Sequence, residues 1–255
     1  MKIGVLGVGN LATYLVQGAQ TAGHQFLLSP RGAKNASDLA KRFGCQVATS
    51  NQSLVDQSEL ILVCLPANAG LAILRGLTFR SGQTVCSAMA TAATLDDIRQ
   101  SVAPAEAVLA MMPGYANAFS AGPTFLFPPN PVWADFFAAC GPVHEVSDAR
   151  DFQTAAVFGA MSGASVFLMR RLAAWYEAEG LSPDLARRLV AETFRGNAEV
   201  LLQSAESFDA ICTGVTTPGG ITEQLLSDLD RGGALDSWLH AMTRVLHRMA
   251  PHRKP

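Results

Sequence analysis

The chain has 255 residues, of which 49% are hydrophobic and 16% charged, and its formal net charge at pH 7 is −2. This length allows one large domain or two smaller ones, and the charge excludes a general affinity for nucleic acid or anionic membranes. Five cysteines lie scattered without CxxC spacing, a pattern typical of reduced cytoplasmic thiols that predicts neither disulfides nor a metal site. Because no uninterrupted apolar run approaches ~18 residues, we expect no membrane span.

The N-terminal segment predicts the phosphate-binding turn of a Rossmann-type domain. Lys2–Leu6 has the pattern of a buried strand, Asn10–Ala22 that of a helix, and the GxGxxA sequence lies between them. The first glycine permits a tight turn, the second lets the backbone approach a pyrophosphate, and the alanine allows close helix–strand packing. Free N–H groups at the helix start favour phosphate. We therefore expect cofactor contacts from Gly7, Gly9, Asn10 and Leu11.

The loop after the second predicted strand indicates which dinucleotide binds. An NAD enzyme usually carries an acidic residue here to bind the ribose 2′-hydroxyl. This loop contains no acid and offers Ser29 and Arg31, with Lys34 and Asn35 at the next helix start. A hydroxyl and a guanidinium suit a 2′-phosphate, so we expect NADP (NADPH) and contacts from Ser29 and Arg31. A solvated basic loop is the alternative interpretation.

Alternating strands and helices continue to residue 146. We expect further short strands at Gln46–Ala48, Leu60–Leu65, Thr84–Ser87, Ala107–Met111, Thr124–Phe127 and 141–146. This alternation predicts an α/β fold, a doubly wound and mostly parallel sheet over residues 1–146. After the apolar strand at Leu60–Leu65, we expect Leu65, Pro66 and Asn68 to line the cofactor site.

Residues 147–255 have a helical pattern throughout, which predicts an all-helical dimerisation and substrate domain. The segment Ala155–Met169 is too apolar on all sides for a surface helix. Such a helix is buried on more than one face, often by another subunit. We therefore expect a homodimer or larger homo-oligomer whose interface includes this segment.

One loop in the helical half has donors suited to an anion. Thr213–Thr222 combines Pro218 and the Gly219-Gly220 pair with several hydroxyls, directly before a helix. Backbone N–H groups at such a helix start can hold a carboxylate or another polar atom. A plain capped helix turn is the alternative.

Taken together, these motifs resemble the pyrroline-5-carboxylate reductase family over essentially the full length of the chain. The resemblance rests on IGVLGVGNLA, LSPRG, LVCLP, MMPG, GPVHEVSD and VTTPGGITEQLL. It implies reduction of a cyclic imine, 1-pyrroline-5-carboxylate, to proline by NADPH, in an active site formed where a Rossmann domain meets helical-domain residues that include the partner's. It also implies that Thr222 bonds the imine nitrogen as the catalytic residue, and that the preceding turn, with Thr217, Gly219 and Gly220, binds the substrate carboxylate.

The sequence departs from the family pattern where the family carries polar groups. The family's lysine, arginine, asparagine and tyrosine correspond here to Leu65, Ala110, Gly114 and Ser165. Two alternatives therefore stay open: an NADP-dependent oxidoreductase acting on another imine or carbonyl, and a non-catalytic NADP-binding dimer. Imine reduction needs little acid–base machinery, because a protonated pyrroline nitrogen already activates its carbon toward hydride. The sequence's lack of a His–Asp pair or metal motif is compatible with this chemistry.

Overall fold

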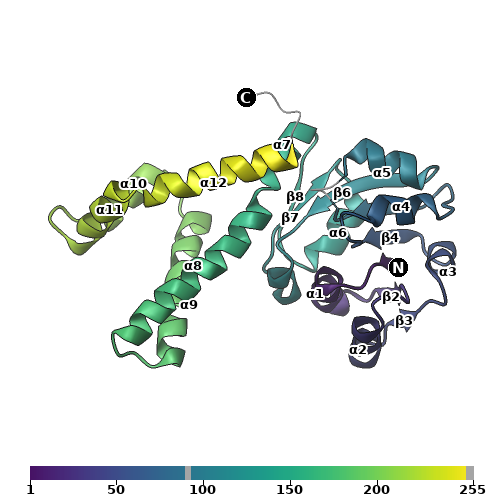
Figure 1. Cartoon of the computed structure of the whole chain (residues 1–255), viewed down its shortest axis with the longest axis horizontal. Coiled ribbons are helices and arrows are strands. Elements are labelled where there is room, and N and C mark those ends of the chain that lie inside the picture. The colour runs from purple at the N-terminus through teal and green to yellow at the C-terminus, as the bar shows by residue number, and fades with distance from the viewer. Residues whose placement is uncertain (90–92, 251–255) are drawn as a thin grey trace. The chain divides into compact units, whose positions relative to one another are not determined.

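One eight-stranded sheet organises the N-terminal part of the chain in the computed structural model, which describes residues 1–89 and 93–250 (Figure 1). The strand order is β3-β2-β1-β4-β5-β6-β7-β8. Neighbouring strands are parallel except β6 and β7, which pair antiparallel. The strands are β1 Lys2–Leu6, β2 Gln25–Leu28, β3 Gln46–Val47, β4 Leu60–Val63, β5 Thr84–Ser87, β6 Glu106–Met111, β7 Thr124–Phe127 and β8 Val143–Glu145.

Helices cover both faces of this sheet, because its strands are apolar on both sides. One core joins the sheet to α1 (Asn10–Ala19), α2 (Ala33–Phe43) and α6 (Pro131–Ala138). The opposite core joins it to α3 (Asn51–Asp56), α4 (Gly70–Arg75), α5 (Leu95–Val102) and α7 (Ala149–Ala155). Successive strand residues alternate between the cores: Ile61 packs on one face and Leu62 on the other. The predicted α/β doubly wound fold is thus confirmed.

Several element boundaries differ from those predicted, including one-residue differences in β3 and β6 and a shorter β8. The first helix ends at Ala19 and continues as a 3₁₀ turn, η1 (Gln20–Ala22), before Gly23 adopts a left-handed conformation. The apolar strand β4 ends at Val63, so Leu65 belongs to a loop. The apolar segment Ala155–Met169, expected to form one buried helix, is divided between the last residue of α7 and the helix α8 (Phe158–Ala178).

The chain divides into two compact units: the first comprises Met1–Gly159 together with the C-terminal end from Met249, and the second lies between them. The first unit takes in α7, because Phe152 of α7 stacks on Phe127 of β7 at a ring-centroid distance of 5.7 Å. The boundary predicted from the sequence, after residue 146, precedes α7, a helix that packs on the sheet. The second unit, Ala160–Arg248, is entirely helical. Its helices are α8, α9 (Pro183–Gln203), α10 (Phe208–Val215), α11 (Ile221–Arg231) and α12 (Ala234–Met249).

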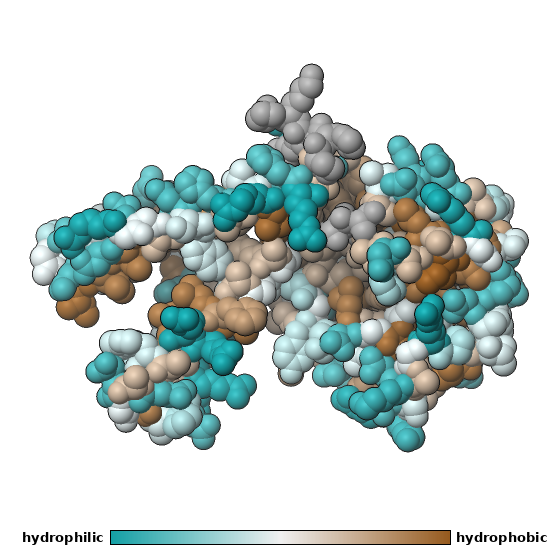
Figure 2. Space-filling model, viewed as in Figure 1, coloured by the Kyte–Doolittle hydropathy of each residue, from teal (hydrophilic) through white to brown (hydrophobic). Residues whose placement is uncertain are grey.

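The helical unit has almost no core of its own in the single chain. Within residues 160–248, all of which the structure describes, only Ala186 and Val190 are buried. Large apolar side chains stand in solvent instead, including Phe167 at 69% exposure and Leu202 at 81%. Figure 2 shows hydrophobic residues gathered on the surface of α10 and α11. Apolar surface of this extent marks an interaction face.

One stretch, Ala149–Ala178, is long and apolar enough to cross a membrane, with a mean hydropathy of 1.4 over its most apolar window. The expectation of no membrane span rested on the lack of an uninterrupted apolar run, and this stretch passes the length and composition criterion although polar and charged residues interrupt it. Length and composition alone are weak grounds for a membrane span, because helices buried between subunits have the same properties.

We expect the free energy of unfolding to decrease as the pH falls below 6.5, through His24. Burial, and secondarily the charged N-terminus, lowers the pKa of His24 from 6.5; its ring packs on Phe136 at 5.7 Å. Just below that pH the unfolded chain binds a proton that the folded chain does not, so unfolding is favoured. The stability of wild type relative to His24→Gln, measured in urea, should fall between about pH 7 and pH 5. A difference that does not change with pH would contradict this prediction.

Candidate active site

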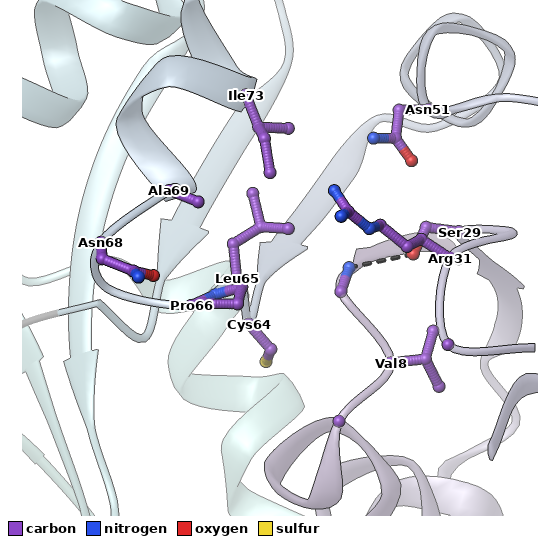
Figure 3. Close-up of a pocket in the computed structure, with 13 residues that line it drawn as sticks. Val8, Ser29, Arg31, Asn51, Cys64, Leu65, Pro66, Asn68, Ala69 and Ile73 are labelled. Atoms are coloured by element: carbon purple, nitrogen blue, oxygen red, sulfur yellow. Dashed lines mark hydrogen bonds between the residues drawn. The ribbon is translucent and has the colours of Figure 1, made fainter.

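A pocket of about 420 Å³ opens at the carboxyl ends of β1, β2 and β4 in the first unit (Figure 3). The strand order reverses between β1 and β4, and ligands of open α/β sheets bind at such a switch point. The lining comes from the glycine turn, the loop after β2, the start of α3 and the β4–α4 segment. It consists of Gly7, Val8, Gly9, Ser29, Arg31, Gly32, Asn51, Cys64, Leu65, Pro66, Asn68, Ala69 and Ile73.

The two glycines of the turn have different physical roles. Gly7 has a φ of +89°, and a Cβ there would lie 2.6 Å from the Cys64 carbonyl oxygen, so this position requires glycine. Gly9 has φ −91° and ψ −168°, an ordinary extended conformation, and a Cβ there would meet no atom within 4 Å. The protein itself therefore leaves room for a side chain at position 9. It is also the N-cap of α1 and provides no side-chain cap, which leaves the first N–H groups of α1 for a ligand.

The loop after β2 holds the glycine turn in place. The Gly7 N–H donates to the Ser29 hydroxyl oxygen at 3.0 Å, and the Asn35 side-chain amide donates to the Val8 carbonyl at 3.0 Å. Gly32, with a φ of +93°, lies so close that a Cβ would be 2.9 Å from that same carbonyl oxygen. Ser29 is buried, and its observed bond fixes the turn.

Arg31 is the free cation of this pocket. Its side chain is exposed, and no carboxylate among the described residues forms a salt bridge with it. The neighbouring Lys34, by contrast, lies 3.6 Å from the Asp38 carboxylate in an exposed pair. The guanidinium of Arg31 is therefore available for an anion at the pocket wall.

The remaining predicted cofactor residues divide between the pocket and its edge. Leu65, Pro66 and Asn68 line the pocket, whereas Asn10 and Leu11, in the first turn of α1, are not part of its lining. Burial raises the pKa of the neighbouring Cys64 thiol to about 12, so Cys64 stays protonated and is not a nucleophile. Sequence reasoning missed six of the lining residues: Val8, Gly32, Asn51, Cys64, Ala69 and Ile73.

The predicted substrate turn lies in the second unit, before α11. Gly219 has a φ of +73°, and Gly220 is the extended N-cap of α11. Both N–H groups already have partners: Gly219 donates to the Glu223 carboxylate at 2.6 Å and Gly220 to the Thr217 carbonyl at 2.9 Å. The hydroxyl of Thr222 is half-buried and has no hydrogen-bond partner among the described residues.

A substrate carboxylate at this turn has two ways to bind. It can take the Gly219 N–H from Glu223, or it can use the N–H groups of the first turn of α11, which lack intrahelical acceptors. The roles predicted for Thr217, Gly219 and Gly220 remain predictions. The geometry adds Glu223 as a group that competes for the same donor.

Both halves of the chain match known protein families. Residues 151–251 match the family described as pyrroline-5-carboxylate reductase dimerisation, and residues 2–91 match NADP oxidoreductase coenzyme F420-dependent. A pyrroline-5-carboxylate reductase 3 from Xenopus laevis is 24% identical over 97% of this chain and 94% of its own length. The chain is thus similar to pyrroline-5-carboxylate reductases over almost its whole length, at low identity.

Two solved structures of the family share the fold over almost the whole chain. A 1-pyrroline-5-carboxylate reductase from Streptococcus pyogenes has a TM-score of 0.84 and 23% identity, and covers 98% of both chains. A pyrroline carboxylate reductase from Plasmodium falciparum, solved with NADP bound, has a TM-score of 0.86 and 19% identity over 98% of this chain and 97% of its own.

The match to a dimerisation family accounts for the exposed apolar helices. Residues 151–251 include most of the stretch that is apolar enough for a membrane. A family domain that assembles subunits supports a homo-oligomer in which these helices pack on another copy.

Proposed function

We propose that this protein reduces the C=N bond of a cyclic imine with NADPH, as its family's reductases do for 1-pyrroline-5-carboxylate. The observation that carries the proposal is the pocket at the β1/β4 switch point, where Gly9 leaves backbone open and Arg31 supplies a free cation. A family match in both halves of the same chain supports it.

The residues present fit the cofactor. The first N–H groups of α1 would hold the pyrophosphate, Gly9 would let it approach the backbone, and Arg31 would pair with the 2′-phosphate. Leu65, Pro66 and Asn68 would line the continuation of the site. When bound there, the nicotinamide supplies a hydride to the substrate carbon.

The chain's own contribution to the chemistry is positioning. The imine nitrogen is already protonated near neutral pH, so accepting a hydride at carbon leaves a neutral amine and needs no proton from the protein. We assign to Thr222 a hydrogen bond at that nitrogen, and to the turn with Thr217, Gly219 and Gly220 the binding of the substrate carboxylate. Because the nitrogen gains a lone pair as its charge disappears, a hydroxyl that donates to this developing lone pair bonds it more strongly in the transition state than in the bound substrate.

Replacing Thr222 with Ala should lower kcat about tenfold while changing KM less, since a single hydroxyl that acts in the transition state is removed. The variant should fold normally because this hydroxyl bonds no other described residue. Thr216→Val is the matched control, because the Thr216 hydroxyl donates to the Cys212 carbonyl at 2.8 Å. An unaltered kcat in Thr222→Ala would show that the turn is structural.

Replacing Arg31 with Ala should weaken NADPH binding by about tenfold to a hundredfold and leave NADH binding unchanged, since one charged hydrogen bond to a phosphate is lost. Lys34→Ala, which removes a neighbouring cation already paired with Asp38, should have little effect. Titration calorimetry with both cofactors measures this. Equal losses for NADPH and NADH in Arg31→Ala would contradict the assignment.

The test of the function is NADPH oxidation over a panel of cyclic imines, ketones and keto acids. Reduction of 1-pyrroline-5-carboxylate would support the family's own substrate. A different imine or a carbonyl is the second candidate, favoured by the uncharged residues Leu65, Ala110, Gly114 and Ser165 where the family carries polar groups. NADPH binding without turnover of any compound would instead indicate a non-catalytic NADP-binding dimer.

We further propose a homodimer in the cytoplasm. The single chain leaves the helical unit without a core, and one symmetric partner is the simplest way to cover it. All five cysteines are free, and burial raises the pKa of Cys64, Cys86 and Cys140. Buried protonated thiols suit a reducing compartment.

A further inference from the structure

The chain segments that follow β4, β5 and β6 are uncharged in sequence. A dinucleotide extends across both halves of a sheet of this order, so its continuation lies over the carboxyl ends of β4, β5 and β6. Residues 60–74, 81–95 and 107–134, which contain β4, β5, most of β6 and the loops that follow, contain no Asp, Glu, Lys, Arg or His. A substrate carboxylate would therefore meet no cation from these segments.

An aromatic cluster stands at the end of β6. It comprises Tyr14 of α1 together with Tyr115 and Phe119 of η2 (Tyr115–Phe119), and we call it the aromatic ridge. The ring centroids of Tyr14 and Tyr115 are 4.8 Å apart, and those of Tyr115 and Phe119 are 5.6 Å apart, edge to face. Tyr115 is 63% exposed and Phe119 67%, so the ridge presents aromatic faces outside the core.

The loop that carries the ridge is rigidly built. Asn117 is fully buried; its carboxamide accepts from the Gly114 N–H at 3.1 Å and donates to the Gly122 and Cys140 carbonyls at 2.7 and 3.2 Å. Gly18 of α1 lies so close that a Cβ would be 2.1 Å from the Asn117 carbonyl oxygen. Buried polar bonds therefore fix the backbone of the loop that carries Tyr115, as a preformed binding surface requires.

The ridge is adjacent to the cofactor turn. A Cβ on Gly114 would lie 3.4 Å from a Leu11 methyl and 3.6 Å from the Tyr14 ring. Leu11 belongs to the first turn of α1, next to the N–H groups that we assign to the pyrophosphate. The aromatic rings, the glycine turn and the uncharged strand ends all lie in the first unit.

From this juxtaposition we propose that the aromatic ridge is a substrate subsite for an uncharged ring, so that the preferred substrate is a cyclic imine bearing an aryl substituent. This inference rests on the proposed function, because it assumes that the reacting C=N bond lies over the same crevice. A flat aryl group can pack on exposed tyrosine and phenylalanine faces. Because the strand ends carry no charged side chain, this packing buries no charge.

The test compares 2-phenyl-1-pyrroline with 2-methyl-1-pyrroline as substrates of the full-length protein with NADPH. In wild type we expect kcat/KM to be about tenfold higher for the phenyl compound. Tyr115→Ala should abolish that preference and leave the methyl compound unaffected, whereas Tyr115→Phe, which keeps the ring and the fold, should retain it. Val132→Ala is the matched control, an exposed apolar residue of α6 in the same unit.

A binding measurement separates the subsite from the reaction. Calorimetry with 2-phenylpyrrolidine and NADP⁺-loaded protein should show binding that Tyr115→Ala weakens about tenfold. If no imine is reduced but this Tyr115-dependent binding persists, the subsite stands and the reductase proposal fails. If imines are reduced without a phenyl preference, the subsite is wrong. Equal losses for both imines in Tyr115→Ala, or a change in its oligomeric state, would mean that the ring packs on protein and would also overturn the subsite.

Discussion

A Gly9→Val variant should fold and yet lose dinucleotide binding by on the order of a hundredfold or more. The backbone at Gly9 is in an extended conformation that valine adopts, and a side chain there meets no protein atom within 4 Å. The new methyl groups would therefore occupy the space that the pyrophosphate needs. Valine is a poor N-cap for α1, which costs about 1 kcal/mol of stability. Titration with NADPH and thermal unfolding measure the two effects separately.

Gly7→Ala is the matched comparison, and we expect it to lose mainly stability where Gly9→Val loses mainly cofactor binding. Its Cβ would clash with the Cys64 carbonyl oxygen at 2.6 Å, at a φ of +89°. We expect several times the stability loss of Gly9→Val, on the order of 3 kcal/mol or more. NADPH binding by Gly9→Val at the wild-type affinity would show that the pocket is not the cofactor site, whatever Gly7→Ala does.

The second large effect concerns assembly. Wild type should sediment as a dimer at micromolar concentration, and Phe167→Glu should dissociate it by at least about a hundredfold, because a symmetric interface would bury two carboxylates in place of two rings. Phe167 lies on α8 and is 69% exposed in the single chain. The control is Val132→Glu, on α6 of the first unit, 39% exposed. Analytical ultracentrifugation tests this; a wild type that is monomeric at micromolar concentration would contradict it.

Local signals predicted the first unit well, because each of its elements has its own hydrophobic periodicity and is bounded by turn or capping residues. β5 and β7 have the predicted bounds, and the glycine turn lies where the GxGxxA pattern places it. What the sequence did not reveal depends on contacts between distant segments. Gly32 is constrained by the Val8 carbonyl of another loop, and the packing that brings them together has no local signature. The break between α7 and α8 is also hidden, since apolar residues continue through it.

The predicted substrate turn carries a sequence signal for its own hydrogen bond. Glutamate at the third helical position commonly reaches back to a free N–H before the helix, and Glu223 holds that position in α11 and bonds Gly219. A ligand that accepts a hydrogen bond from the Gly219 N–H must therefore displace the Glu223 carboxylate. This competition favours the proposed substrate role of Thr222 over that of Gly219.

We propose that this protein moves a hydride from NADPH onto an imine carbon. The test uses NADPH that carries deuterium at both C4 positions, so that the label transfers from either face, with a cyclic imine that the protein consumes, followed by mass spectrometry and NMR of the product amine. We expect one deuterium on the former imine carbon, lost in Gly9→Val and slowed in Thr222→Ala. NADPH binding with no label in the product of any cyclic imine would contradict it.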